Sequence, residues 1–131
     1  MNHRKHFLTS AALIAFGVGG FALIAPAALL ASKGVAPSAA AGVWVREVGA
    51  LLIAIGLIGW LVRAQADSAT LRAVLVGNAL LQFTLLPIEP IAYVQGVITA
   101  LPGIVPNTVL HLLLGVGFAH FALKMGPGSP Q

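Results

Sequence analysis

Three ionisable side chains stand in otherwise apolar sequence and are the best placed to do chemistry: Arg46, Glu89 and His111. Glu89 is the one formal charge between Ala73 and Leu123. Soluble domains carry roughly a quarter charged residues, so a stretch this bare indicates a bilayer as its solvent. Ionisable groups inside such a stretch are expensive to hold there and often mark a functional site.

Depth along the predicted helices suggests which of these groups meet. Arg46 and Glu89 each lie 17 residues from a basic residue, Arg63 and Arg72, that is expected at one membrane boundary. Both therefore reach a depth of about 25 Å, near the opposite boundary. Opposite charges at one depth on antiparallel helices are expected to pair, with His111 of the last helix as a third member.

This predicted cluster has two interpretations. Arg46, Glu89 and His111 line a polar pocket that binds a small ligand or carries a proton, or they form a structural latch between helices. A second structural possibility is that Arg46 and Glu89 extend separately towards the lipid headgroups and do not contact each other. We carry all three as hypothetical ligand-binding residues.

Two amides extend the polar positions along the third helix. Asn78 and Gln82 are four residues apart and share one face, and Glu89 lies within about 20° of them on a straight helix. This stripe predicts a polar bundle interior with hydrogen bonds between helices, in preference to a conduction path, because it lacks a second titratable group.

Other site chemistries are poorly supported. His111 and His120 are nine residues apart, on opposite sides of a helix, so they do not share a metal. The chain has no cysteine, and its serines do not form a nucleophile-elbow pattern. We expect no catalytic residue, metal or cofactor. An enzyme acting on a lipid-soluble substrate stays open only through His111 and Glu89 as acid and base.

The composition of the chain predicts the helices that position these groups. Of 131 residues, 59% are hydrophobic and 8% charged, and the mean hydropathy is +0.99. These values predict a single all-α membrane domain, residues 1–131, folded as a four-helix bundle. The helices are expected at about residues 7–31, 43–62, 69–87 and 105–124.

Several boundaries are open. Pro26 is expected to kink the first helix, which is longer than the core of a signal peptide, the alternative for this segment. The third helix either ends by Pro87, with an interfacial helix over about 90–100, or continues kinked to about Ile98. Leu101–Gly103 is expected to be a turn, and residues 126–131 a flexible tail.

The distribution of Lys and Arg residues predicts the orientation of the chain in the membrane. Five of seven fall on one side: Arg4, Lys5, Arg63, Arg72 and Lys124. By the positive-inside rule both termini are cytoplasmic, in a multi-pass protein of the bacterial cell membrane. Because the cations are scattered, no nucleic-acid partner is expected. The expected partner is the lipid bilayer.

Glycines predict close helix packing. Gly17, Gly19 and Gly20 mark one such face on the first helix, and Gly49 and Gly56, with Gly59, mark another on the second. Small residues let helix backbones approach in a membrane. These faces favour packing against a second copy of the chain or a larger membrane complex.

From Val45 onward the chain resembles the DoxX-like group of small bacterial four-helix membrane proteins. The resemblance rests on Arg46-Glu-Val-Gly-Ala-Leu-Leu, the Trp60-Leu-Val-Arg63 exit and Asp67-Ser-Ala-Thr-Leu-Arg72. It implies the same four-helix fold, and named members of the group are linked to membrane oxidoreductase complexes. The Pro87-Ile-Glu-Pro90 element departs from the pattern of the group.

Two functions are carried forward. The first is a non-enzymatic accessory or assembly subunit of a membrane complex, which the glycine faces favour. The second is a binder or carrier of a small molecule, a quinone or lipid, in a polar pocket near the outer face. The most useful observation for choosing between them is whether Arg46, Glu89 and His111 converge and whether a molecule occupies the space between them.

Overall fold

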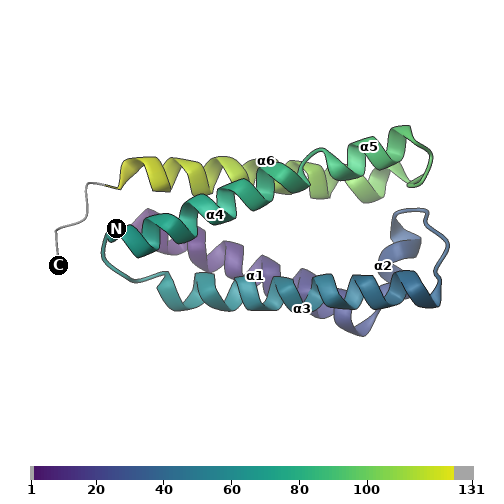
Figure 1. Ribbon diagram of the computed structural model, residues 1–131, viewed down its shortest axis with the longest axis horizontal. Coiled ribbons are helices and arrows are strands. Elements are labelled where there is room, and N and C mark those ends of the chain that lie inside the picture. Colours follow the sequence, from purple (N-terminus) through teal and green to yellow (C-terminus); the bar gives the residue numbers. More distant parts are fainter. Residues whose placement is uncertain (1, 126–131) are drawn as a thin grey trace.

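The computed structural model describes residues 2–125, and within them it holds six helices and no strand. The helices are α1 (Asn2–Ile24), α2 (Pro26–Ser32), α3 (Ala39–Val62), α4 (Ala69–Leu85), α5 (Ile88–Val94) and α6 (Leu101–Lys124), shown in Figure 1. Four spans are long and apolar enough to cross a membrane: residues 3–24, 39–62, 69–94 and 101–124. The predicted all-α fold with four membrane helices is confirmed. The predicted tail, residues 126–131, lies outside the described residues.

The long helices are arranged as two antiparallel pairs, α1 with α3 and α4 with α6 (Figure 1). In the first pair a Cβ added to Gly19 would lie 2.8 Å from the Gly49 carbonyl oxygen, and one added to Gly49 would lie 2.8 Å from that of Gly19. In the second pair, Gly115 faces the ring of Phe83. Each pair is therefore held by backbone-to-backbone or ring-to-backbone approach that a larger residue would block.

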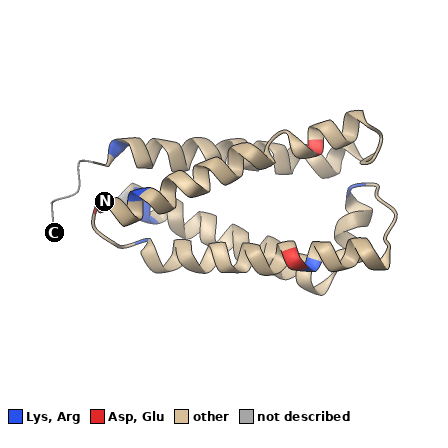
Figure 2. Ribbon diagram, in the orientation of Figure 1, with Lys and Arg blue, Asp and Glu red and all other residues tan. Residues whose placement is uncertain are grey.

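The two pairs meet at the end of the bundle where α1 begins and α6 ends, which we call the terminal end. A buried cluster joins them there, formed by Leu8, Ala11, Leu71, Leu75, Ala79, Phe118, Ala122 and Met125. Arg4 adds polar bonds, because its guanidinium donates to the Asp67 carboxylate and to the Gln65 carbonyl oxygen. Figure 2 shows Lys and Arg concentrated at this end, with fewer charges towards the opposite end.

The opposite end, the distal end, is joined by loops. The amides of Thr99 and Ala100 donate to the Lys33 carbonyl oxygen at 3.2 and 3.1 Å, and the Thr99 hydroxyl donates to the Gly34 carbonyl oxygen at 2.9 Å. We call these bonds the distal clasp. Gly34, which accepts the hydroxyl bond, has φ +69°, a left-handed conformation that favours glycine.

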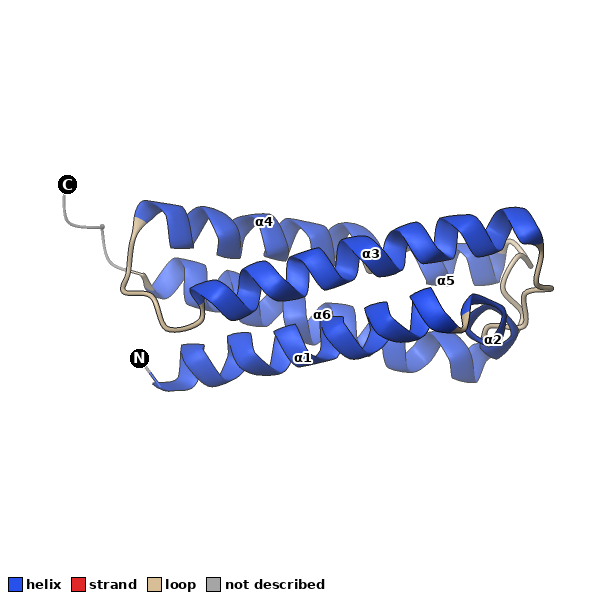
Figure 3. Cartoon of the chain, turned by 90° about the horizontal axis from the view of Figure 1, so that it is seen from below, coloured by secondary structure: helices blue, strands red, loops and turns tan. Residues whose placement is uncertain are grey.

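The first predicted helix is divided in two. Instead of one kinked helix over residues 7–31, α1 ends at Ile24 and α2 begins at Pro26, turned across the distal end (Figure 3). Proline suits this position because the first turn of a helix needs no N–H from it. The turn brings Lys33, which follows α2, over the space between the pairs.

The expected turn at Leu101–Gly103 is wrong, because α6 starts at Leu101. Pro102 lies in its first turn, where a missing N–H breaks no helical bond. The second membrane helix, expected from about residue 43, starts at Ala39. Ser38 caps it by accepting a hydrogen bond from the Ala41 amide at 3.1 Å.

Neither predicted form of the third helix is fully correct. A short helix does follow Pro87, but α5 covers Ile88–Val94, where residues 90–100 were expected. The linking residues keep helical dihedral angles, with φ −51° and ψ −47° at Leu86 and φ −81° and ψ −15° at Pro87. Consequently α5 continues roughly in the direction of α4 (Figure 1).

Candidate binding site between the helix pairs

A cavity of about 360 Å³ lies between the two helix pairs. Leu8, Leu52, Leu81 and Leu114 show its character, because they come from α1, α3, α4 and α6 and all line it. Most other lining residues are also aliphatic or aromatic. The polar side chains that line the cavity are Lys33, Asn78, Gln82, Glu89, Asn107 and His111. This is an apolar chamber with a small set of polar groups.

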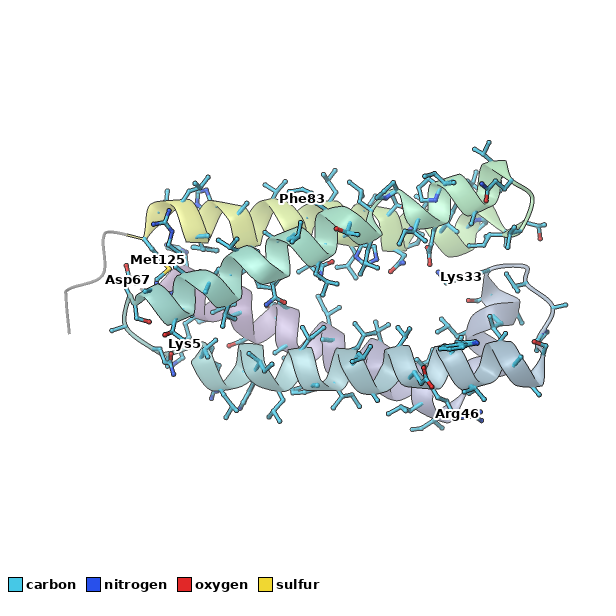
Figure 4. The ribbon with its side chains drawn as sticks, viewed as in Figure 1. Lys5, Lys33, Arg46, Asp67, Phe83 and Met125 are labelled. Atoms are coloured by element: carbon cyan, nitrogen blue, oxygen red, sulfur yellow. The ribbon has the colours of Figure 1, made fainter. Side chains whose placement is uncertain are left out.

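Lys33 and Glu89 form an ion pair at the distal end of the cavity. Lys33 Nζ lies 2.5 Å from Glu89 Oε1 and 3.3 Å from the carbonyl oxygen of Gly103. The two charged side chains are only 16% and 18% exposed. Figure 4 shows Lys33 on the side of α2 that faces the α4–α6 pair. The ion pair therefore bridges the two helix pairs.

His111 and Gln82 form the second polar contact of the cavity. Nδ1 of His111 lies 2.6 Å from Oε1 of Gln82, and Gln82 is 8% exposed. Because an amide oxygen only accepts, Nδ1 carries the proton, and Nε2 of the neutral ring is then an acceptor. This bond links α4 to α6 within one helix pair.

Asn78 lies one helical turn before Gln82 and is half-buried. Its Nδ2 donates to the Val74 carbonyl oxygen at 2.9 Å, on its own helix. The predicted polar face of Asn78 and Gln82 is thus turned towards the cavity, with Gln82 bonded across to α6.

Arg46 does not join the predicted cluster. It is exposed on α3, does not line the cavity, and its guanidinium folds back to within 3.6 Å of a Cβ built on Gly42. Figure 4 shows Arg46 on the side of α3 away from the α4–α6 pair. Lys33 takes the predicted role of Arg46 as the partner of Glu89. The sequence offered no sign of this, because Lys33 reads as an ordinary loop residue between helices.

One oxygen atom among the polar side chains of the cavity lacks a hydrogen-bond partner. Among residues 2–125, Glu89 Oε2 is buried and has no hydrogen-bond partner. A buried carboxylate oxygen without a donor is destabilising, and natural structures rarely leave one. This oxygen is an acceptor that a bound molecule would satisfy.

The described residues contain no group of three His, Asp or Glu side chains close enough to hold a metal ion. His120 lies apart from His111, with its ring edge-on to Phe121 at 5.2 Å. The arrangement of the cavity suits binding of a molecule that has an apolar body and a polar group.

No family model, curated protein or solved structure matches the chain.

Proposed function

We propose that this chain is a multi-pass membrane protein that binds one small, largely apolar molecule between its two helix pairs. The cavity carries this proposal: its volume of about 360 Å³ falls in the range of ligand pockets, roughly 300–1,000 Å³. Its walls are mainly apolar, and its few polar side chains suffice to orient a ligand. A quinone or a lipid is the class of molecule that a bilayer would supply.

The polar end of the cavity faces the outer side of a bacterial cell membrane in this proposal. Arg63, Arg72 and Lys124 adjoin the terminal end of the long helices, and the positive-inside rule assigns that end to the cytoplasm. Lys33 and Glu89 then lie near the outer boundary. A ligand would place its polar group there and its apolar body towards the membrane centre.

The role of accessory subunit is supported less well. It was inferred from the glycine faces. Gly19, Gly49 and Gly56 pack against neighbouring helices of the same chain, whereas no described residue lies within 4 Å of a Cβ added to Gly17 or Gly20. Membership of the DoxX-like group, with its link to membrane oxidoreductase complexes, is likewise a proposal. It fits a chain with four membrane spans.

Native mass spectrometry of the protein in lipid nanodiscs tests the binding function. We expect a bound molecule at a ratio of one per chain, distinct from the lipids of the disc. Leu81 lines the cavity, whereas its neighbour Leu80 is 66% exposed. The variant Leu81→Trp should bind less of this molecule because the larger ring takes up part of the cavity.

Leu80→Trp is the matched control, because it adds the same ring to the same helix on an exposed face. It should keep the bound mass. Absence of any bound molecule from the parent protein, or equal retention in both variants, would contradict the proposed function.

A further inference from the structure

We infer that the bound molecule carries an uncharged hydroxyl group, which donates to Glu89 Oε2 and accepts from Lys33 Nζ. The inference rests on the proposed function and specifies its ligand class. It assigns the polar end of the cavity to a lipophilic alcohol or phenol.

Glu89 supplies the acceptor. Its Oε1 is taken by Lys33, while Oε2 is buried and, among residues 2–125, has no donor. A ligand that brings an N–H or O–H to this point removes the unsatisfied acceptor. A headgroup with acceptors alone, such as a quinone carbonyl or an ether, leaves it in place.

Lys33 supplies the complementary donor. Its ammonium group has three N–H bonds, and the described residues take two of them, through Glu89 Oε1 and the Gly103 carbonyl oxygen. The third is open to a ligand oxygen. A hydroxyl both donates and accepts, so a single oxygen atom meets the open requirement of each partner.

The rest of the polar wall offers further acceptors alongside the NH₂ donors of its amides. With Nδ1–H of His111 directed at Gln82, the other ring nitrogen is an acceptor. Asn78 donates one of its two N–H bonds to the Val74 carbonyl oxygen, so it can present its side-chain oxygen as an acceptor and its second N–H as a donor.

Charge argues for a neutral headgroup. Lys33 and Glu89 already neutralise each other. A phosphate or carboxylate here would be attracted by Lys33 and repelled by Glu89, and an ammonium group the reverse, so neither charge gains a large net attraction. Either charge would also have to be desolvated without an unpaired counter-ion in the cluster.

Three matched probes test the headgroup on the purified protein in detergent: 1-dodecanol, 1-methoxydodecane and dodecanoate. The ether keeps the chain and the oxygen of the alcohol but has no O–H, and dodecanoate adds a charge. We expect 1-dodecanol to bind about tenfold more tightly than the ether, as one hydrogen bond to a charged group implies. Dodecanoate should bind no better than the ether. Titration calorimetry measures all three.

A paired substitution ties the preference to the ion pair. Lys33→Met with Glu89→Leu removes both charges together, so no unpaired charge is left buried. The alcohol and the ether should then bind within about twofold of each other. Arg46→Met with Glu47→Leu is the matched control, because it removes one exposed positive and one exposed negative charge outside the cavity. It should keep the tenfold preference.

The outcomes separate this inference from the proposed function. Equal binding of alcohol and ether, or tighter binding of dodecanoate, overturns the hydroxyl assignment and leaves a binding cavity. A preference that survives loss of the ion pair also overturns it. Failure of all three probes, together with no bound mass in nanodiscs, overturns both.

Discussion

Lys33 Nζ lies 2.5 Å from Glu89 Oε1, and this contact joins the two helix pairs at the distal end, away from the buried cluster that joins them at the terminal end. The terminal end holds its pairs together by close packing. Among residues 2–125, the polar contacts that join the pairs at the distal end are the Lys33–Glu89 ion pair, the Lys33 bond to the Gly103 carbonyl oxygen and the distal clasp. Stability there should depend on few side chains.

The single variants Lys33→Met and Glu89→Leu should each lower the free energy of unfolding by about 3 kcal/mol, because each leaves a largely buried charge without its partner. The double variant should lie close to the parent protein. A double-mutant cycle by chemical unfolding in mixed micelles measures the coupling. Additive losses would show that the two charges do not interact.

Gly49→Ala should lower the free energy of unfolding by about 1–3 kcal/mol, since its Cβ would lie 2.8 Å from the Gly19 carbonyl oxygen. Gly77→Ala is the control, because nothing lies within 4 Å of its added Cβ. That variant should gain about 0.5–1 kcal/mol from helix propensity. Losses of equal size in the two variants would contradict the close approach of α1 and α3.

Gly34 and Gly96 separate backbone strain from the distal clasp. Both have positive φ, +69° and +74°, so alanine at either should cost about 1–2 kcal/mol. At Gly34 the added Cβ would also lie 2.2 Å from Thr99 Oγ1, whereas at Gly96 nothing lies within 4 Å. Gly34→Ala should therefore lose at least about 1 kcal/mol more in unfolding experiments. Equal losses would mean that the clasp adds nothing.

Membrane orientation is testable because the chain has no cysteine of its own. Ala36→Cys lies in the exposed α2–α3 loop at the distal end, and Ala66→Cys in the exposed α3–α4 loop at the terminal end. A membrane-impermeant maleimide should label Ala36→Cys in intact cells and Ala66→Cys only after permeabilisation. The reverse pattern would invert the proposed topology.

Sequence periodicity and charge predicted the fold class because helix length and apolarity are local properties. The four spans follow from runs of about 20 apolar residues. The boundaries at Pro26, Pro87 and Pro102 were less predictable. A proline restricts its own φ and removes a donor, but neighbouring packing decides whether it kinks, divides or begins a helix.

The sequence predicted how deep the site residues lie along their helices, but not which side of the helix each side chain occupies. Glu89, His111, Asn78 and Gln82 were singled out as polar groups in apolar sequence, and the structure places all four on one cavity. Arg46 has the expected depth along α3 but points away, since depth arithmetic carries no information about rotation of one helix against another. Lys33 entered only through the turn of α2 across the distal end.

The pairing of neighbouring helices has a consequence for biogenesis. Residues 2–62 form the α1–α3 pair by themselves, and residues 69–124 form the α4–α6 pair. The first pair can thus assemble in the bilayer while the ribosome is still translating the second. If the chain is divided in the α3–α4 connection and the two halves are expressed together, they should associate into one functional unit. The buried cluster at the terminal end would be their main contact surface.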